Sequence, residues 1–168
     1  TSAGVTFTQP ITINSPSGSV TLQDAFVTST NSTALTLTAG TFDANNYNVT
    51  FTGSAGAFTS SNTNTRTLAI GTGTWTLVAI APWSTSNSTN LTVTGTGTIS
   101  LTSTSAKTFT GGGVNYSGIT LDNGGAGTLT ITGNNTFKNI TNSYSATGAT
   151  TIAFGATTQT LTNPFTAT

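Results

Sequence analysis

The chain has 168 residues, which is enough for one domain with a substantial core. It contains three Lys or Arg residues and three Asp or Glu residues, so charged residues make up 4% of it, against about 25% in an ordinary soluble domain. A net charge of zero without a basic cluster argues against nucleic acid or an anionic membrane surface as a partner.

The missing residue types exclude several kinds of chemistry. The chain has no His and no Cys, which excludes catalysis by a nucleophile and a histidine, zinc sites of the usual nitrogen and sulfur type, and disulfides. We therefore expect no cofactor and no metal site. The longest apolar run, Leu77–Pro82, is far shorter than the roughly 20 residues that a membrane-spanning helix needs, so we also expect no membrane insertion.

Short segments along the whole chain alternate apolar residues with Thr, and no segment has the spacing of an amphipathic helix. Period-two alternation is typical of a strand with one buried face, and Thr itself favours strands. The sequence therefore predicts an all-β protein with threonine on its outer faces. The predicted strands are, in chain order, Val5–Thr8, Ile11–Ile13, Val20–Leu22, Ala34–Thr38, Val49–Thr52, Thr74–Leu77, Leu91–Thr94, Thr98–Thr102, Ile119–Leu121, Thr128–Thr132 and Thr160–Thr162.

Turn-forming residues separate these strands, as in Asn14–Ser19, Gly71–Gly73 and Asn123–Gly127. Many short strands with such turns fit either a β-solenoid or a β-sandwich of the jelly-roll or pilin type. Internal similarity favours the solenoid, because GTGTWTL at Gly71–Leu77 returns as GTGTISL at Gly95–Leu101. We predict a parallel β-helix-like solenoid whose coils have roughly 20–24 residues each, a length typical of short solenoid repeats.

Longer phrases of the chain resemble a known group of repeats. They are LTAGTFDANNYNVTFT at Leu37–Thr52, NTRTLAIGTGTWTL at Asn64–Leu77 and GTLTITGNNTFKNI at Gly127–Ile140. The chain resembles the Thr/Gly-rich tandem repeats of large phage virion proteins and bacterial surface proteins, over about Leu35 to Phe165. The resemblance implies a repetitive β-solenoid on a virion or cell surface, and no catalytic residue can be carried over from it.

We expect one all-β domain over residues 1–168. Residues 34–165 form its repeat-like solenoid, and residues 1–33 form N-terminal strands that could dock onto, or be donated to, a neighbour. Neither end of the sequence resembles a polar cap, and an uncapped solenoid exposes strand edges. The sequence therefore predicts self-association through the solenoid ends, as a homo-oligomer or filament.

The most plausible enzyme would be a tailspike-like glycan hydrolase or lyase, which needs two carboxylates at a defined separation. The carboxylate side chains of the sequence are those of Asp24, Asp43 and Asp122. Each lies in a turn-like segment, where Asp commonly accepts backbone hydrogen bonds. Lys107 and Lys138 could form isopeptide bonds to Asn in a dry core, but a solvated lysine at a strand end is the favoured interpretation. We predict that the protein is not an enzyme.

Two binding functions remain open on sequence grounds. Trp83 lies beside Pro82 before a polar stretch, so it is the candidate for an exposed aromatic that stacks on a cell-surface glycan, while Trp75 is expected in the core. Repeated Thr-x-Thr motifs resemble the ice-binding face of antifreeze solenoids, but their uneven spacing does not predict a regular lattice. The main hypothesis is a non-enzymatic extracellular structural or adhesion module of a phage fibre or bacterial surface protein. A subunit of a self-assembling extracellular filament is the first alternative.

Overall fold

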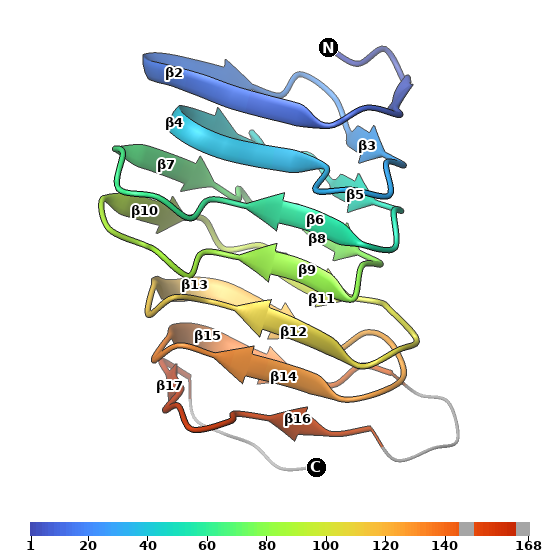
Figure 1. Ribbon diagram of the computed structural model, residues 1–168, viewed down its shortest axis with the longest axis vertical. Coiled ribbons are helices and arrows are strands. Elements are labelled where there is room, and N and C mark those ends of the chain that lie inside the picture. Colours follow the sequence, from blue (N-terminus) through green and yellow to red (C-terminus); the bar gives the residue numbers. More distant parts are fainter. Residues whose placement is uncertain (145–149, 164–168) are drawn as a thin grey trace.

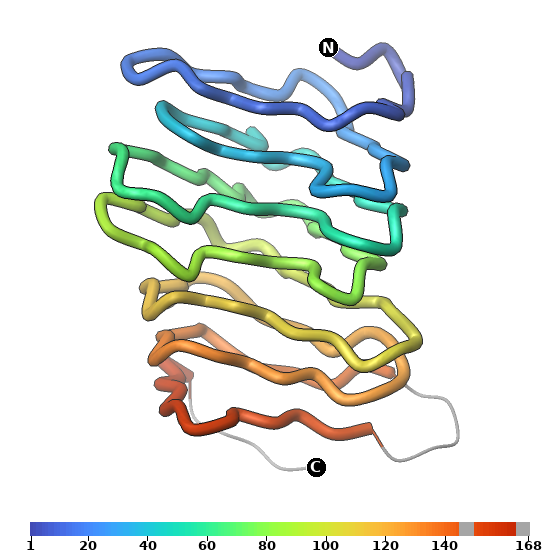
Figure 2. The backbone as a smooth tube through the Cα atoms, viewed as in Figure 1, coloured from blue at the N-terminus to red at the C-terminus, as the bar shows by residue number. Residues whose placement is uncertain are grey.

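The computed structural model describes residues 1–144 and 150–163, and over these residues the chain is a parallel β-solenoid of about six turns. Every strand pairing is parallel, and no helix occurs in the described residues. Figures 1 and 2 show the coils stacked along one long axis, with residue 1 at one end and the last strands at the other. The prediction of an all-β solenoid is therefore confirmed.

The strands form two hydrogen-bonded sheets, one of eight strands and one of nine. The first sheet contains β1 (Thr6–Phe7), β3 (Phe26–Thr28), β5 (Val49–Phe51), β8 (Thr74–Leu77), β11 (Thr98–Leu101), β13 (Asn115–Asp122), β15 (Thr136–Thr141) and β17 (Thr160–Leu161). The second contains β2 (Ile11–Thr21), β4 (Leu35–Asp43), β6 (Gly56–Thr59), β7 (Arg66–Ala69), β9 (Ala81–Ser84), β10 (Leu91–Thr94), β12 (Lys107–Thr110), β14 (Leu129–Thr132) and β16 (Ile152–Ala153).

Long strands that bend round a corner divide these sheets into three columns. The first half of β4 pairs with β6, whereas its second half pairs with β7. The first halves of β2 and β4, followed by β6, β9, β12, β14 and β16, form a column that we call column B. The second halves of β2 and β4, followed by β7 and β10, form a column that we call column C. Column C continues further along the stack where Asn115 and Tyr116 of β13 pair with β15, which pairs in turn with β17. Column A is the remaining ladder, from β1 to β13 and the second half of β15.

The spacing of ladder partners explains why the repeat is irregular in the sequence. The sequence separation between ladder partners differs from coil to coil. More residues separate Phe58 from its partner Trp83 than separate Thr6 from its partner Val27. The spacing is shortest between Thr120 and Asn139, beside a register shift in β13. Corners and bulges of different length lie between the paired positions, so the coil length varies on both sides of the predicted range.

Aromatic rings fill the axis of the solenoid almost from end to end. In β8 the burial pattern alternates, with Trp75 and Leu77 buried and the threonines between and before them turned outward. The ring of Trp75 contacts those of Phe51, Phe58 and Trp83 at centroid distances of 6.0–6.2 Å. Aromatic pairs add to the stabilisation from burial. Further ring contacts extend this column of rings from Phe7 to Phe137.

The stack of coils begins within residues 1–33. β1 and β2 form the first coil, because they pair with β3 and β4 of the next coil of the same chain. The stretch Asn14–Ser19, expected as a turn, is an irregular part of β2 that faces only Ala39 to Thr41 of the next coil. It forms a corner without ending the strand. Positions 145–149, 164 and 165 of the predicted repeat region lie outside the described residues.

Candidate functional surfaces

Trp83 is not an exposed sugar-stacking residue, so that prediction is wrong. Only 1% of its surface is exposed, because β9 turns it inward between Phe58 and Phe109 of the coils on either side. Its ring lies 4.4 Å from that of Phe58 and stacks on that of Phe109 at 5.4 Å, measured between centroids. The neighbouring Pro82 signals a loop in the sequence, yet it lies inside the strand. Trp75 is in the core, as predicted.

A buried group of polar atoms surrounds the Trp83 indole. Its Nε1–H donates to the Tyr116 hydroxyl at 3.2 Å, and that hydroxyl lies 2.9 Å from Thr85 Oγ1 and donates to the Gly111 carbonyl at 3.2 Å. Burial raises the pKa of the Tyr116 phenol well above its ordinary value, against the opposing effect of its bonds with Thr85 and Trp83. The phenol is therefore a neutral structural link between coils.

The three aspartates have separate hydrogen-bond partners, and no two of them share one among the described residues. Asp43 accepts from the Asn45 N–H at 2.8 Å, which is the expected role of Asp in its own turn. Asp122 accepts from the hydroxyls of Ser100, Thr141 and Ser143, which belong to the coils before and after it. These carboxylates serve as acceptors that fix turns and neighbouring coils.

Asp24 fixes the start of the chain. It accepts hydrogen bonds of 2.7 Å from the backbone N–H groups of Ser2 and Ala3 and from the Thr1 hydroxyl. The bond from the Ser2 N–H, followed by that from the Thr1 hydroxyl, holds the pKa of Asp24 well below its usual range. These hydrogen bonds thus stabilise the ionised form of Asp24 in the folded state relative to the unfolded state.

We expect acid to loosen this N-terminal segment. A lowered carboxyl pKa contributes stability above the unfolded value of 3.8, and this contribution is lost as the pH falls through the lower, folded value. Amide exchange of Ser2 and Ala3 should therefore lose protection below about pH 4, whereas Asp24→Asn should show weak protection at neutral pH already. Equal protection in the variant and the parent at neutral pH would contradict this role.

Two of the three cations are buried and bind backbone carbonyls. Lys107 is 2% exposed, so the expectation of a solvated lysine there is wrong. Its Nζ donates to the carbonyls of Ser103, Gly125 and Ala126 at 3.1, 3.4 and 2.8 Å, which accounts for all three ammonium protons. Burial lowers the pKa of Lys107, although the nearby Asp122 carboxylate acts in the opposite direction. An ammonium group bound in this way is a tether between coils and not a free nucleophile.

Arg66 makes the equivalent contacts at another corner. Its side chain is 1% exposed, and its guanidinium donates to the carbonyls of Asn62, Asn87 and Thr89 and to the Asn62 side chain. Burial lowers the pKa of Arg66. Both tethers join a corner loop to the loop of the next coil, so they close the corners of the stack where strand pairing is absent.

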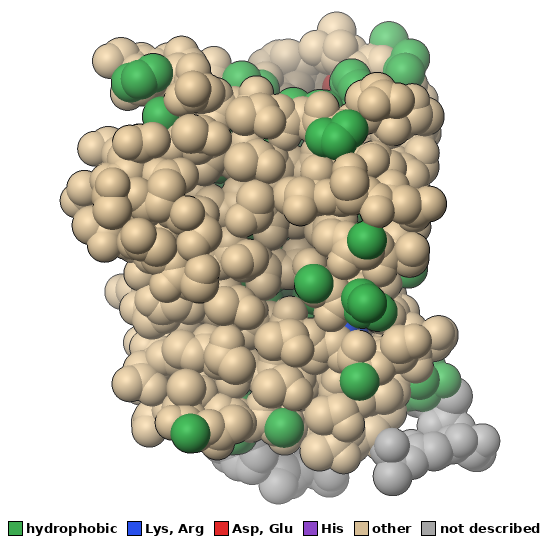
Figure 3. All heavy atoms as spheres, viewed as in Figure 1, with side chains coloured by type: hydrophobic (Ala, Val, Ile, Leu, Met, Phe, Trp, Pro, Cys, Tyr) green, Lys and Arg blue, Asp and Glu red, His purple; other side chains and the backbone are tan. Residues whose placement is uncertain are grey.

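One outer rank of column B consists of hydroxyl side chains, one from each of six successive coils. Its residues, in ladder order, are Thr12, Thr36, Thr59, Ser84, Thr110 and Thr132. In the rank beside it, Thr108 and Thr130 are followed by Ala153. Column B therefore presents a single rank of hydroxyls and not the two matched ranks per coil that an ice lattice requires. Figure 3 shows one face of the molecule, on which polar side chains and backbone predominate and hydrophobic side chains are scattered.

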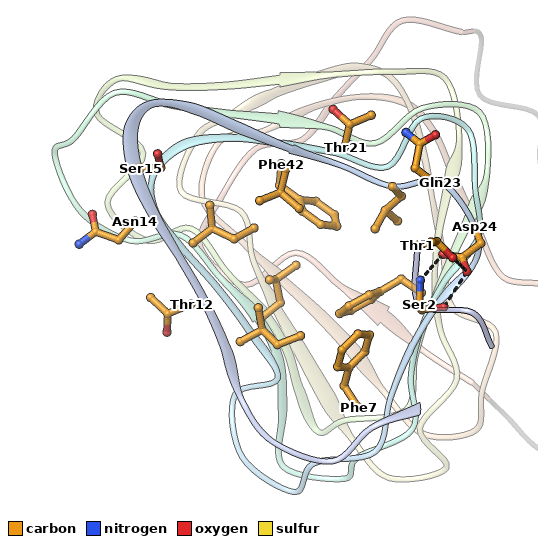
Figure 4. A pocket seen from close by; sticks show the side chains of 16 residues that line it. Thr1, Ser2, Phe7, Thr12, Asn14, Ser15, Thr21, Gln23, Asp24 and Phe42 are labelled. Atoms are coloured by element: carbon orange, nitrogen blue, oxygen red, sulfur yellow. Dashed lines mark hydrogen bonds between the residues drawn. The ribbon is translucent and has the colours of Figure 1, made fainter. Parts of the chain in front are cut away.

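The end of the stack that carries β1 and β2 is open, and we call it the open end. β2 pairs with β4 along one edge, and among the described residues no strand pairs with its other edge. A cavity of about 430 Å³ opens inside β2, and Figure 4 shows β2 running round its rim with hydrophobic side chains inside. Its lining includes Phe7, Ile11, Ile13, Val20, Leu22 and Phe26. Thr1 and Ser2 lie at the rim beside Asp24 and leave the cavity open.

Within the described residues, His, Cys, Asp and Glu do not gather into a group of three that could hold a metal ion. The described part of the chain also has no helix of the length and apolar character needed to cross a membrane. In comparisons with protein-family models, curated proteins and solved structures, the chain matches none of them. The candidate functional surfaces thus rest on the chain's own geometry.

Proposed function

We propose that the chain is a non-enzymatic structural module of an extracellular fibre or surface protein, and that it extends by stacking coils end to end. The observation that carries this proposal is the open end, where an unpaired strand edge and an apolar cavity lie together. An unpaired edge is a template for another parallel strand, and the cavity is the same kind of interior that the next coil fills elsewhere in the stack.

The occupant we propose is the last coil of a second copy of this chain. β16 lies in column B and β17 in column C, which are the columns that the two halves of β2 occupy in the first coil. Since all strands run parallel, a second copy placed in the same direction continues both columns. Such a contact joins two different surfaces, and a contact of that type repeats without closing unless its rotation forms a ring.

Two other features support a structural role. Asp24, Asp43 and Asp122 are each held by separate backbone or hydroxyl donors, which is the arrangement of structural acceptors. The repeats of phage virion and bacterial surface proteins that the sequence resembles imply a location outside the cell. An adhesive role would need a ligand site on the outer faces.

Sedimentation measurements on the chain across a range of concentrations test the proposal. We expect linear oligomers that lengthen with concentration. Val20→Arg places a charge at the open end, where Val20 is 43% exposed, so the fold should persist while the oligomers dissociate. Ile80→Arg is the matched control, because Ile80 is 52% exposed and does not line the cavity. A wild-type chain that stays monomeric throughout, or equal loss of association in both variants, would overturn the proposal.

A further inference from the structure

Over the residues that the structure describes, strand pairing along the stack is interrupted once, in column C between β10 and β13. Strand pairing joins β10 to β7 on one side, but none joins it to β13 on the other. A groove of about 500 Å³ opens there, lined by Leu91–Gly95 and by Val114, Asn115 and Ser117–Ile119. We call this groove the slot. Its place in the stack is visible in Figure 1, where β13 follows β10 along the axis.

The slot is closed at both of its ends. Before it, the Ser88 hydroxyl donates to the Gly112 carbonyl at 2.7 Å. After it, the backbone of Gly118 approaches the Gly95 carbonyl so closely that an added Cβ would lie 2.1 Å from that oxygen. The two coils therefore meet on either side of the slot. Five residues of strand span roughly 16 Å, so the slot is long enough for a saccharide of one or two rings, and its closed ends exclude an extended peptide of more than about five residues.

The walls of the slot offer both hydrogen-bonding and apolar groups. The Asn90 and Thr94 carbonyls accept from the Arg66 and Ile70 N–H groups of β7 and the loop after it. Because backbone groups alternate along a strand, the N–H and C=O of Val93 point the other way, into the slot. Leu91 and Val93 are only half-buried, whereas Leu68, which faces inward in β7, is fully buried. The slot thus exposes apolar side chains beside an unpaired amide donor and acceptor.

No charged residue lines the slot. Its polar side chains are those of Thr92, Thr94, Asn115 and Ser117, all of which are exposed at its mouth. Hydroxyls and amides both donate and accept, and so do the hydroxyls of a neutral sugar. The volume also lies within the range of small-molecule sites, about 300–1,000 Å³. We infer that the slot between β10 and β13 is a binding site for a neutral saccharide of one or two hexopyranose rings.

The test is a titration of the ¹⁵N-labelled chain, followed by its amide resonances, with maltose, cellobiose and lactose as probes. The Val20→Arg background keeps the sample monomeric, so the outcome does not depend on end-to-end association. We expect saturable shifts confined to residues 91–95 and 114–119 with at least one of the sugars. Ser117→Trp and Thr92→Trp, on opposite walls, should each weaken binding by about tenfold or more by filling the mouth. Thr104→Trp, at an exposed loop position outside the slot, should bind as the background does.

Three outcomes would overturn the inference. One is the absence of saturable shifts at the slot with all three sugars, and another is unchanged binding in both blocking variants. The third is a response of the slot to the peptide Thr-Val-Thr-Val-Thr without any response to the sugars, which would make β10 a strand-pairing edge. Resonances outside the slot report whether each variant keeps the fold, so a misfolded variant is recognised directly and the other one carries the test.

Discussion

Gly112→Ala is expected to destabilise the protein by about 2–5 kcal/mol, because two costs coincide at this position. The backbone of Gly112 has φ +65°, a left-handed conformation that strains any residue with a Cβ. An added Cβ would also lie 1.8 Å from the Thr85 carbonyl oxygen of the preceding coil. Backbone atoms cannot rotate away, so the two coils would have to separate. Thermal or denaturant unfolding measures the loss.

The neighbouring Gly113 provides a matched control. Its φ is +78°, but an added Cβ would meet nothing closer than 3.8 Å. Gly113→Ala therefore carries the conformational strain alone and should cost about 1–2 kcal/mol. The difference between the two variants isolates the contact between coils, and each kcal/mol corresponds to a shift in Tm of about 2–4 °C at this chain length. Equal destabilisation by the two variants would show that the coils are less tightly stacked than described.

Trp83→Ala is expected to destabilise the protein by about 3–5 kcal/mol, as do other deletions of a large buried aromatic side chain. The change removes the ring that lies between Phe58 and Phe109 and also the donor to the Tyr116 hydroxyl. Because Trp83 lies near the middle of the column of rings, the cavity would interrupt the core on both sides. Denaturant unfolding followed by circular dichroism measures the effect.

Two further variants separate the contributions at Trp83. Trp83→Phe keeps a ring in place and loses the indole N–H, so we expect a smaller loss, about 1–2 kcal/mol, from that hydrogen bond and the reduced volume. Thr104→Ala, at an exposed position, should stay within about 0.5 kcal/mol of the parent. If Trp83→Ala behaved like Thr104→Ala, the indole would have to lie outside the core, as the sequence had suggested.

The period-two pattern of the sequence predicted the strands in which apolar residues alternate with threonine. Thr74–Leu77 and Leu91–Thr94 were predicted with the bounds of β8 and β10. β7 and β12 were missed, because each begins with a cation, and a cation in a chain with so few charges is expected to face water. Arg66 and Lys107 instead face inward and reach corner carbonyls, which belong to loops that no local pattern could bring together.

The candidate surfaces were less accessible to prediction than the fold. An uncapped end could be expected from the absence of polar capping residues, but the cavity inside β2 depends on how the first coil closes. The slot lies beside a register shift in β13, which has extra residues opposite β15 between Tyr116 and Thr120. Ser117 and Gly118 do not indicate such a shift in the sequence, since glycine and serine also occur in ordinary turn segments of this chain, such as Asn14–Ser19. Trp83 was predicted to lie in a loop because proline is rare inside strands, yet its neighbour Pro82 lies within β9.

The parallel pairing of every strand has a consequence for growth of the proposed fibre. A stack of copies in one direction has two unlike ends, so addition at one end uses a different surface from addition at the other. A copy with Val20→Arg keeps its last coil and lacks a usable open end. It would therefore act as a chain terminator, and a small fraction of it mixed with the parent should shorten the oligomers well beyond simple dilution.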